Sequence, residues 1–278
     1  MKYIILPSLI LATLLFSCGD SKESTTNDAD HSSVNADLKM KAGEQVDRFA
    51  DIQVIRYDIV DFDKLTIDQK KLVYYMSQAG LAGRDIIYDQ NNPYNLEIRN
   101  CLEDVIQKYK GDKTSADWKN MMVYAKQIWF ANGIHHHYGM TKFTPKFSES
   151  VFKNYVKQTG AKISDQALNV MFDPTVAAKR KVKDASKDMI VASANGFYGK
   201  GVTQQMVDDY YARIVDKTAK HPIEYGLNST MILKDGTAYE DVWKIDGKYG
   251  KAITKIVFWL EKAVTVAEND TQKKALKK

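Results

Sequence analysis

The sequence predicts an α+β fold that is mainly helical and contains only short β segments. Helix-start motifs and apolar residues at helical spacing recur along the chain, whereas strand patterns are few. Thr66 and Gln69 form a capping-box pattern, in which each side chain bonds the backbone N–H of the other residue. Ser148 and Ser164 are typical helix N-caps, and Thr203 opens a further helix. Strands are expected at residues 52–59, 189–194 and 227–233.

The expected helices follow in chain order. After Thr66, an apolar and small stripe continues to Ile87, through Leu72, Val73, Met76, Ala79, Gly80 and Gly83. A second helix spans residues 94–109, and a third begins at residues 114–117 and ends at Gly133. Val202 is placed to pack against Val207, one turn into the helix that Thr203 opens. The last and longest element spans residues 239–269 and is periodic from Ala252.

Residues 1–17 have the pattern of a lipoprotein signal peptide. Lys2 precedes an uncharged, largely apolar run at residues 3–16, which is too short to span a membrane. Ser17 then precedes Cys18, so cleavage before Cys18 would leave its thiol free for a diacylglyceryl group. The alternative is an ordinary secretory signal followed by an unrelated cysteine.

Residues 18–37 are predicted to be the lipid anchor and a flexible polar spacer. They are rich in Ser, Thr, Asn and Asp, and cannot bury enough surface to offset the entropy of ordering. We therefore expect an exported, membrane-anchored lipoprotein on the periplasmic or cell-surface side. The net charge of +5 comes without a basic stripe interleaved with aromatics, so no nucleic-acid partner is predicted.

The two cysteines exclude a disulfide framework if Cys18 is lipidated. Cys101 then has no intramolecular partner and lies among Leu96, Ile98, Leu102, Val105 and Ile106. This apolar setting favours a buried, structural role for the Cys101 thiol. The alternative is that Cys101 is a nucleophile activated by a histidine that lies close in space.

Three consecutive histidines, His135, His136 and His137, lie between Gly133 and Gly139. Neighbouring side chains point in different directions, so at most two of the three could converge on one metal ion. The segment is interpreted as a loop lining a cleft, with metal coordination and a plain surface loop as alternatives.

Asp58, Asp61 and Asp63 lie in a short acidic loop where a weak cation site is conceivable. The chain contains no His-Glu-x-x-His helix, Gly-x-Ser-x-Gly elbow, Walker loop or Gly-x-Gly-x-x-Gly.

Many blocks of the sequence resemble bacterial dipeptidyl-peptidase III of the Bacteroidetes type. The likeness begins at RFADIQVIRY and continues through KLVYYMSQAGLAGRDIIYDQN, YNLEIRNCLE, IWFANGIHHHYGMTKFTPKFS, FDPTVAAKR, GVTQQ, YGLNS and KIVFWLEKAVTVAEND. These blocks extend over essentially all of the chain after the spacer.

The resemblance implies a zinc exopeptidase that releases dipeptides from the N-termini of oligopeptides. In that family two lobes flank a cleft. The mostly helical upper lobe carries a His-Glu-x-x-Gly-His zinc helix and a later glutamate, and the lower lobe contains a small β-barrel. This motif is absent here, so residues 38–278 are expected to be a truncated, N-terminal and mostly lower-lobe part. No catalytic residue or metal ligand is predicted in this chain, and we expect it to be inactive by itself. The alternative is a non-catalytic lipoprotein module that binds peptides or a protein partner.

One cleft position can be matched residue by residue. Animal members carry Ser-Phe-Gly-Asp and then Lys-Phe, which places an aromatic ring in the substrate cleft. Tyr138 matches that aromatic residue, whereas His137 and Met140 depart from the animal pattern. The resemblance thus implies that Tyr138 contacts the oligopeptide substrate, with His135, His136 and His137 as neighbours of the cleft.

Overall fold

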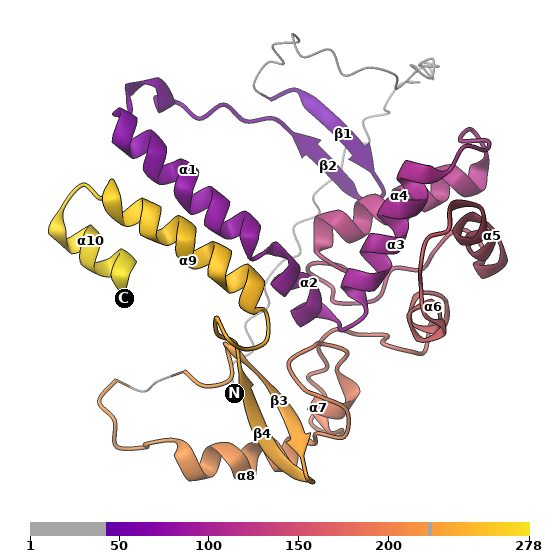
Figure 1. Ribbon diagram of the computed structural model, residues 1–278. Helices are drawn as coiled ribbons and strands as arrows, with labels where there is room; N and C mark the ends of the chain where they lie inside the picture. Colours follow the sequence, from indigo (N-terminus) through magenta and orange to yellow (C-terminus); the bar gives the residue numbers. More distant parts are fainter. Residues whose placement is uncertain (1–42, 222–223) are drawn as a thin grey trace, which may run out of the picture. The chain divides into compact units, whose positions relative to one another are not determined.

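The computed structural model describes residues 43–221 and 224–278 (Figure 1). The predicted signal peptide, the lipidation site Cys18 and the spacer at residues 18–37 lie outside the described residues. The fold is α+β and mainly helical, as predicted. The β segments are β1 (Gln45–Phe49), β2 (Ile52–Ile55), β3 (Ser229–Lys234) and β4 (Thr237–Val242). The first helices are η1 (Phe62–Lys64, a 3₁₀ turn), α1 (Ile67–Ala82), α2 (Arg84–Asn91), α3 (Asn95–Lys108), α4 (Ala116–Ala131) and α5 (Glu149–Thr159). The others are α6 (Asp165–Phe172), α7 (Met189–Ala192), α8 (Gln204–Ile214), α9 (Gly250–Thr265) and α10 (Asp270–Lys277).

The predicted helix starts are confirmed by their capping geometry. Thr66 and Gln69 form the complete capping box of α1. The Ser148, Ser164 and Thr203 side chains accept a backbone N–H from the first turns of α5, α6 and α8. Ser115 does the same for α4, within the predicted start at residues 114–117. Each such cap contributes about 1 kcal/mol of stability.

The largest hydrophobic core is built by α3, α4, α5 and α6. Ile98 and Leu102 of α3, Met121 and Ile128 of α4, and Phe152 of α5 are fully buried in it. Tyr109 stacks on Trp118 with ring centroids 4.8 Å apart. Each fully buried large apolar side chain stabilises the fold by about 1.5–3 kcal/mol, so these four helices carry most of the burial.

The two sheets of the described residues are antiparallel hairpins of two strands each, β1–β2 and β3–β4. The β3–β4 turn consists of Asp235 and Gly236, which both have positive φ, as a type I′ turn requires. β3 fulfils the prediction of a strand at residues 227–233. A second, smaller core joins this hairpin to α8 through Met231, Val202 and Val207.

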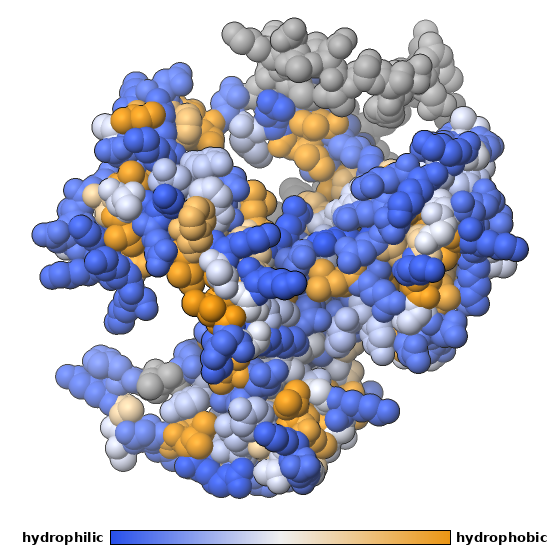
Figure 2. All heavy atoms as spheres, in the orientation of Figure 1, coloured by the Kyte–Doolittle hydropathy of each residue, from blue (hydrophilic) through white to orange (hydrophobic). Residues whose placement is uncertain are grey.

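Helices α1 and α9 lie side by side, and α10 packs on α9 (Figure 1). In this pair only the small residues Ala79 and Ala263 are fully buried. Larger apolar side chains stay exposed, namely Val73, Tyr74, Met76, Leu81 and Phe258. Hydrophobic residues are visible on the surface over both helices (Figure 2). The apolar stripe predicted from Leu72 to Ile87 is thus divided between α1 and α2 at Gly83, and most of it is not buried.

Three predicted elements are corrected by the structure. Residues 189–192 form the helix α7 rather than a strand, because the Asp188 carboxylate accepts the backbone N–H groups of Ile190 and Val191. The long element expected at residues 239–269 is divided into the end of β4, a turn and α9. The strand expected at residues 52–59 ends at Ile55.

Candidate functional site

The histidine loop, residues 133–139, follows directly after α4. Asn132 ends that helix in the left-handed conformation, and Gly133 follows with φ +142°. The Asn95 amide oxygen accepts the N–H of Ile134 at 3.1 Å. A Cβ atom at Gly133 would lie 2.1 Å from the Asn95 amide nitrogen, so a residue with a side chain cannot fit there without displacing Asn95. The entry to the loop is therefore fixed by one buried amide.

The three histidine side chains do not converge. The His135 Nε2 atom donates to the Ala177 carbonyl at 2.7 Å within the core, whereas His136 Nε2 lies 3.1 Å from the Asp51 carboxylate. His137 stacks on His136 with ring centroids 4.4 Å apart, and its ring meets the edge of Phe130. Within residues 43–221 and 224–278, no three His, Cys, Asp or Glu side chains form a group suited to a metal ion. The histidines therefore do not fit one zinc ion.

Burial and charge set the protonation of these groups. Burial lowers the pKa of His135 to about 4, so its imidazole is neutral at pH 7. Partial burial also lowers the pKa of His137, and the neighbouring His136 adds to this effect. The hydrogen bond from His136 lowers the pKa of Asp51, which keeps that carboxylate ionised.

His136 organises the loop around Tyr138. Its Nδ1 atom accepts the backbone N–H groups of Tyr138 at 3.2 Å and Gly139 at 3.0 Å. An acceptor at Nδ1 places the proton of the neutral ring on Nε2, where it donates to Asp51. The His136 backbone also bonds Thr141 and Met140 on the returning strand of the loop. This ordered turn leaves Tyr138 85% exposed.

Lys142 supports the loop from behind. Its ammonium donates to the carbonyls of Val170 and Val176 at 2.9 Å and 2.6 Å, and also to that of Asp173. These carbonyls belong to the end of α6 and the segment after it, where a cation is favoured. The site residues predicted from sequence therefore have different environments. Tyr138 is exposed, His136 and His137 are partly exposed beside it, and His135 is buried.

A cavity of about 740 Å³ lies next to the histidine loop and was not predicted from the sequence. Its apolar lining includes Met189, Ile190, Phe197, Val207 and Met231, from four separate segments of the chain. Arg180, Lys181 and Lys183 add positive charge to the lining. The run of basic residues at 179–183 was the one sequence signal that could have drawn attention to it.

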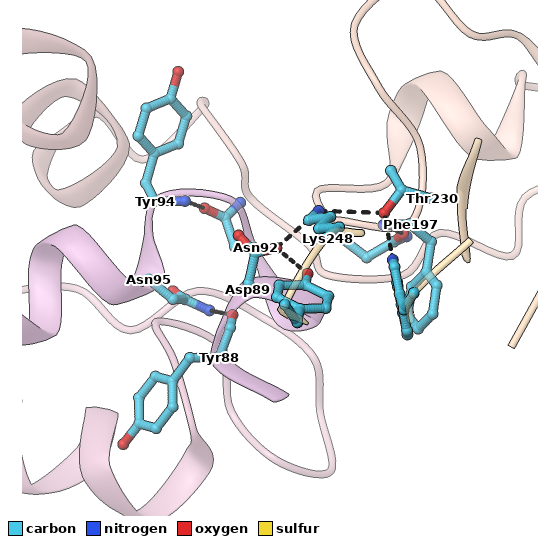
Figure 3. A network of polar contacts seen from close by, with 11 residues as sticks. Tyr88, Asp89, Asn92, Tyr94, Asn95, Phe197, Thr230 and Lys248 are labelled. Carbon is cyan, nitrogen blue, oxygen red and sulfur yellow. Dashed lines mark hydrogen bonds and ion pairs between the residues drawn. The ribbon is translucent and has the colours of Figure 1, made fainter. Parts of the chain in front are cut away.

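A polar network links α2, β3 and the segment before α9 (Figure 3). Asp89 of α2 pairs with Lys248 at 3.0 Å and accepts the hydroxyl of Tyr249. Lys248 also donates to Thr230 of β3 at 3.2 Å, and Trp243 donates to the same hydroxyl. Burial and the bond to Asp89 raise the pKa of Tyr249. The cavity-lining residues Gln90 and Asn91 follow Asp89, and Ser229 and Met231 flank Thr230.

Two other sequence candidates, Cys101 and the acidic loop, lie outside the histidine loop. Cys101 is buried, and this burial raises the pKa of its thiol to about 12, so the thiolate nucleophile does not form near pH 7. Asp61, in the acidic loop with Asp58 and Asp63, pairs with the exposed Lys64 at 2.8 Å.

Comparison of the sequence with models of known protein families finds no match, and a search among curated proteins finds no relative. The resemblance to dipeptidyl-peptidase III stays a prediction from the residues quoted above. Within the described part of the chain, no helix is both long and apolar enough to cross a membrane.

Proposed function

We propose that this chain is the peptide-binding, N-terminal part of a lipid-anchored dipeptidyl-peptidase of the dipeptidyl-peptidase III type. The single observation that supports peptide binding best is Tyr138, an exposed ring on an ordered loop. Because His136 holds the loop through two backbone N–H groups, little entropy is lost when a peptide packs against the ring. An aromatic side chain also offers a large contact area with few rotatable bonds.

The binding test uses fluorescent pentapeptides with free N-termini and measures their anisotropy with the purified chain. We expect Tyr138→Ala to raise the Kd about tenfold, which corresponds to about 1.4 kcal/mol. Tyr57→Ala is the matched control, because Tyr57 is 81% exposed and is not among the ring contacts of Tyr138. Equal Kd values for the wild-type and Tyr138→Ala proteins would contradict the proposal.

In the proposed enzyme, zinc would polarise the scissile carbonyl and activate water. The described histidines diverge, so we assign no catalytic step to residues of this chain. We expect no chelator-sensitive release of dipeptides from dipeptidyl-naphthylamides by the tag-free chain. Addition of a polypeptide that carries the His-Glu-x-x-Gly-His motif and its upper lobe should produce such activity. Chelator-sensitive hydrolysis by the chain alone would overturn this assignment.

The lipid anchor is tested separately. We expect radiolabelled fatty acid to be incorporated into the wild-type protein and not into Cys18→Ser, which should leave the membrane fraction or remain unprocessed. Cys101→Ser is the control, because Cys101 is buried and should not affect labelling. Incorporation of label into Cys18→Ser would show that the anchor is assigned to the wrong residue.

The alternative function is a non-catalytic lipoprotein module that binds peptides or a protein partner, and it is compatible with the same peptide binding. It differs in that addition of the zinc-bearing lobe would produce no hydrolysis. The reconstitution experiment therefore decides between the two.

A further inference from the structure

Arg180 lines the 740 Å³ cavity, and its guanidinium has no carboxylate partner among the described residues. One of its N–H groups donates to the Asn91 amide oxygen at 2.9 Å, which is the one side-chain hydrogen bond that the described residues give it. A guanidinium has five N–H donors in a planar fork, so most of its donor capacity is unused. Half-buried arginines are normally paired, because removing the charge from water is costly. This cost lowers the pKa of Arg180.

The backbone around Arg180 is held firmly. Its N–H donates to the Met140 carbonyl at 2.9 Å, and its carbonyl accepts the Asn195 amide at 3.3 Å. These bonds fix the position of the residue independently of its side chain. The backbone of Arg180 is therefore held in place at the cavity wall, so fewer degrees of freedom remain to be ordered when its side chain binds a ligand.

The other charges of the lining strengthen the preference for an anion. Lys181 and Lys183 line the same cavity and make no ion pair with the described residues. Asp208 is the one carboxylate of the lining, and it makes no ion pair with Arg180. Three positive side chains thus face one negative side chain in the lining. Because the cavity is partly shielded from water, the attraction between these positive side chains and a bound anion is stronger than in bulk solvent.

The remaining lining indicates what the anion is attached to. Met189, Ile190, Phe197, Val207 and Met231 provide an apolar surface from α7, α8, β3 and the segment before α8. A cavity of 300–1,000 Å³ with mostly apolar walls and a few placed polar groups is typical of a small-molecule site. A single phosphate or acetate ion would leave the apolar part unused.

We propose that this cavity binds an apolar carboxylate, with the carboxylate on Arg180 and the hydrocarbon part against the Met189–Ile190 wall. Two ligands share this chemistry, the C-terminal end of a short apolar peptide and a fatty acid. The planar guanidinium can bind both carboxylate oxygens at once, which an ammonium group cannot do. The inference does not rest on the peptide-binding role of Tyr138, because that residue does not line this cavity.

Isothermal titration calorimetry with four probes tests the site. Decanoate and N-acetyl-Leu-Phe represent the two sources, N-acetyl-Leu-Phe-amide removes the charge, and acetate removes the apolar part. We expect at least one of the two apolar acids to bind at least tenfold more tightly than both the amide and acetate. The stronger of the two identifies the source. If neither apolar acid binds, or if the amide binds as well as the acid, the proposal is wrong.

Variants of the full chain then identify the anchor. We expect Arg180→Gln to weaken binding of the apolar acid at least tenfold. Arg180→Lys should weaken it less, because the charge remains while the fork is lost. Arg213→Gln is the matched control, because Arg213 lies on α8 over Tyr210 and does not line the cavity. Thermal unfolding is measured for every variant, and Arg180→Lys serves as the decisive variant if Arg180→Gln does not fold. Unchanged affinity in a folded Arg180 variant would overturn the proposal.

Discussion

His135 and Ala177 are joined by a hydrogen bond of 2.7 Å between the imidazole Nε2 atom and the backbone carbonyl oxygen. The imidazole is 1% exposed, and its Nε2 atom must carry the proton because a carbonyl can only accept. The Nδ1 atom has no hydrogen-bond partner among the described residues. Protonation of Nδ1 would therefore create a buried positive charge with no group to compensate it.

Acid should destabilise the protein through His135. A histidine in the unfolded chain binds a proton near pH 6.5, whereas His135 in the folded chain does so at about pH 4. The folded pKa is lowered, so the contribution to stability is present above pH 6.5 and is lost as the pH falls toward 4. The loss is on the order of 3 kcal/mol. Urea unfolding at a series of pH values measures it.

His135→Gln should flatten this dependence between pH 6.5 and 4, because the glutamine amide can still donate to Ala177 but does not titrate. His221→Gln is the matched control, because it makes the same substitution at an exposed histidine. If the His135→Gln protein kept the wild-type slope, His135 would not be its source.

The Asp89 network should contribute measurably to stability. The Asp89 side chain is 17% exposed and bonds both Lys248 and Tyr249. We expect Asp89→Ala to lower the free energy of unfolding by about 2 kcal/mol, because the Tyr249 hydroxyl loses its acceptor and Lys248 loses its carboxylate partner. Asp246→Ala breaks an exposed pair with Lys244 and should cost about 0–0.5 kcal/mol. Denaturant midpoints compare the two variants, and equal losses would contradict the assigned role.

Replacing either of two glycines, Gly196 and Gly80, by alanine should change the stability of the protein in opposite directions. A Cβ atom at Gly196 would lie 2.0 Å from the Asp89 carbonyl oxygen, so Gly196→Ala must displace the backbone. We expect a loss of more than 2 kcal/mol. Gly80 lies inside α1 with open space around it, so Gly80→Ala should stabilise the protein by about 0.5–1 kcal/mol. Thermal unfolding measures the stability of both variants. A stabilised Gly196→Ala protein would contradict the close approach of Gly196 to the Asp89 carbonyl oxygen.

Local stability should differ between the two groups of helices. Helices α3 and α4 lie in the large core, whereas α1 and α9 bury only one residue each completely. We therefore expect backbone amides of α1 and α9 to exchange with deuterium faster than those of α3 and α4. Hydrogen exchange followed by mass spectrometry checks this order. Equal protection in both groups would show that the α1–α9 pair is as stable as the core.

Local sequence determined the helix starts and the helices of the large core. Thr66, Ser148 and Ser164 were identified because an N-cap is formed by residues three positions apart. The helical spacing of Trp118, Met121, Ala125 and Ile128 in the sequence matches the buried face of α4. These features depend on contacts within one or two turns, which the order of residues specifies directly.

The sequence also indicated that at most two of the three histidines could converge on one point, since adjacent side chains point in different directions. It could not indicate that His136 turns back to hold Tyr138, or that Asp51 would be the partner of His136. That pair is 85 residues apart in the chain. Its formation depends on where the β1–β2 hairpin packs.

Tertiary contacts decided the remaining features. Residues 189–192 have apolar, strand-like composition, yet Gln204 of α8 accepts the N–H of Met189 and donates its own N–H to Asp188, and these contacts hold them as a helical turn. The apolar stripe of α1 resembles that of a core helix, but its partner α9 covers only part of it. The cavity at Arg180 draws its lining from α7, α8, β3 and the segments between them. The sequence alone therefore determined the short-range elements, whereas the cavity and the surroundings of Arg180 arose from contacts between distant segments, whose packing no local pattern encodes.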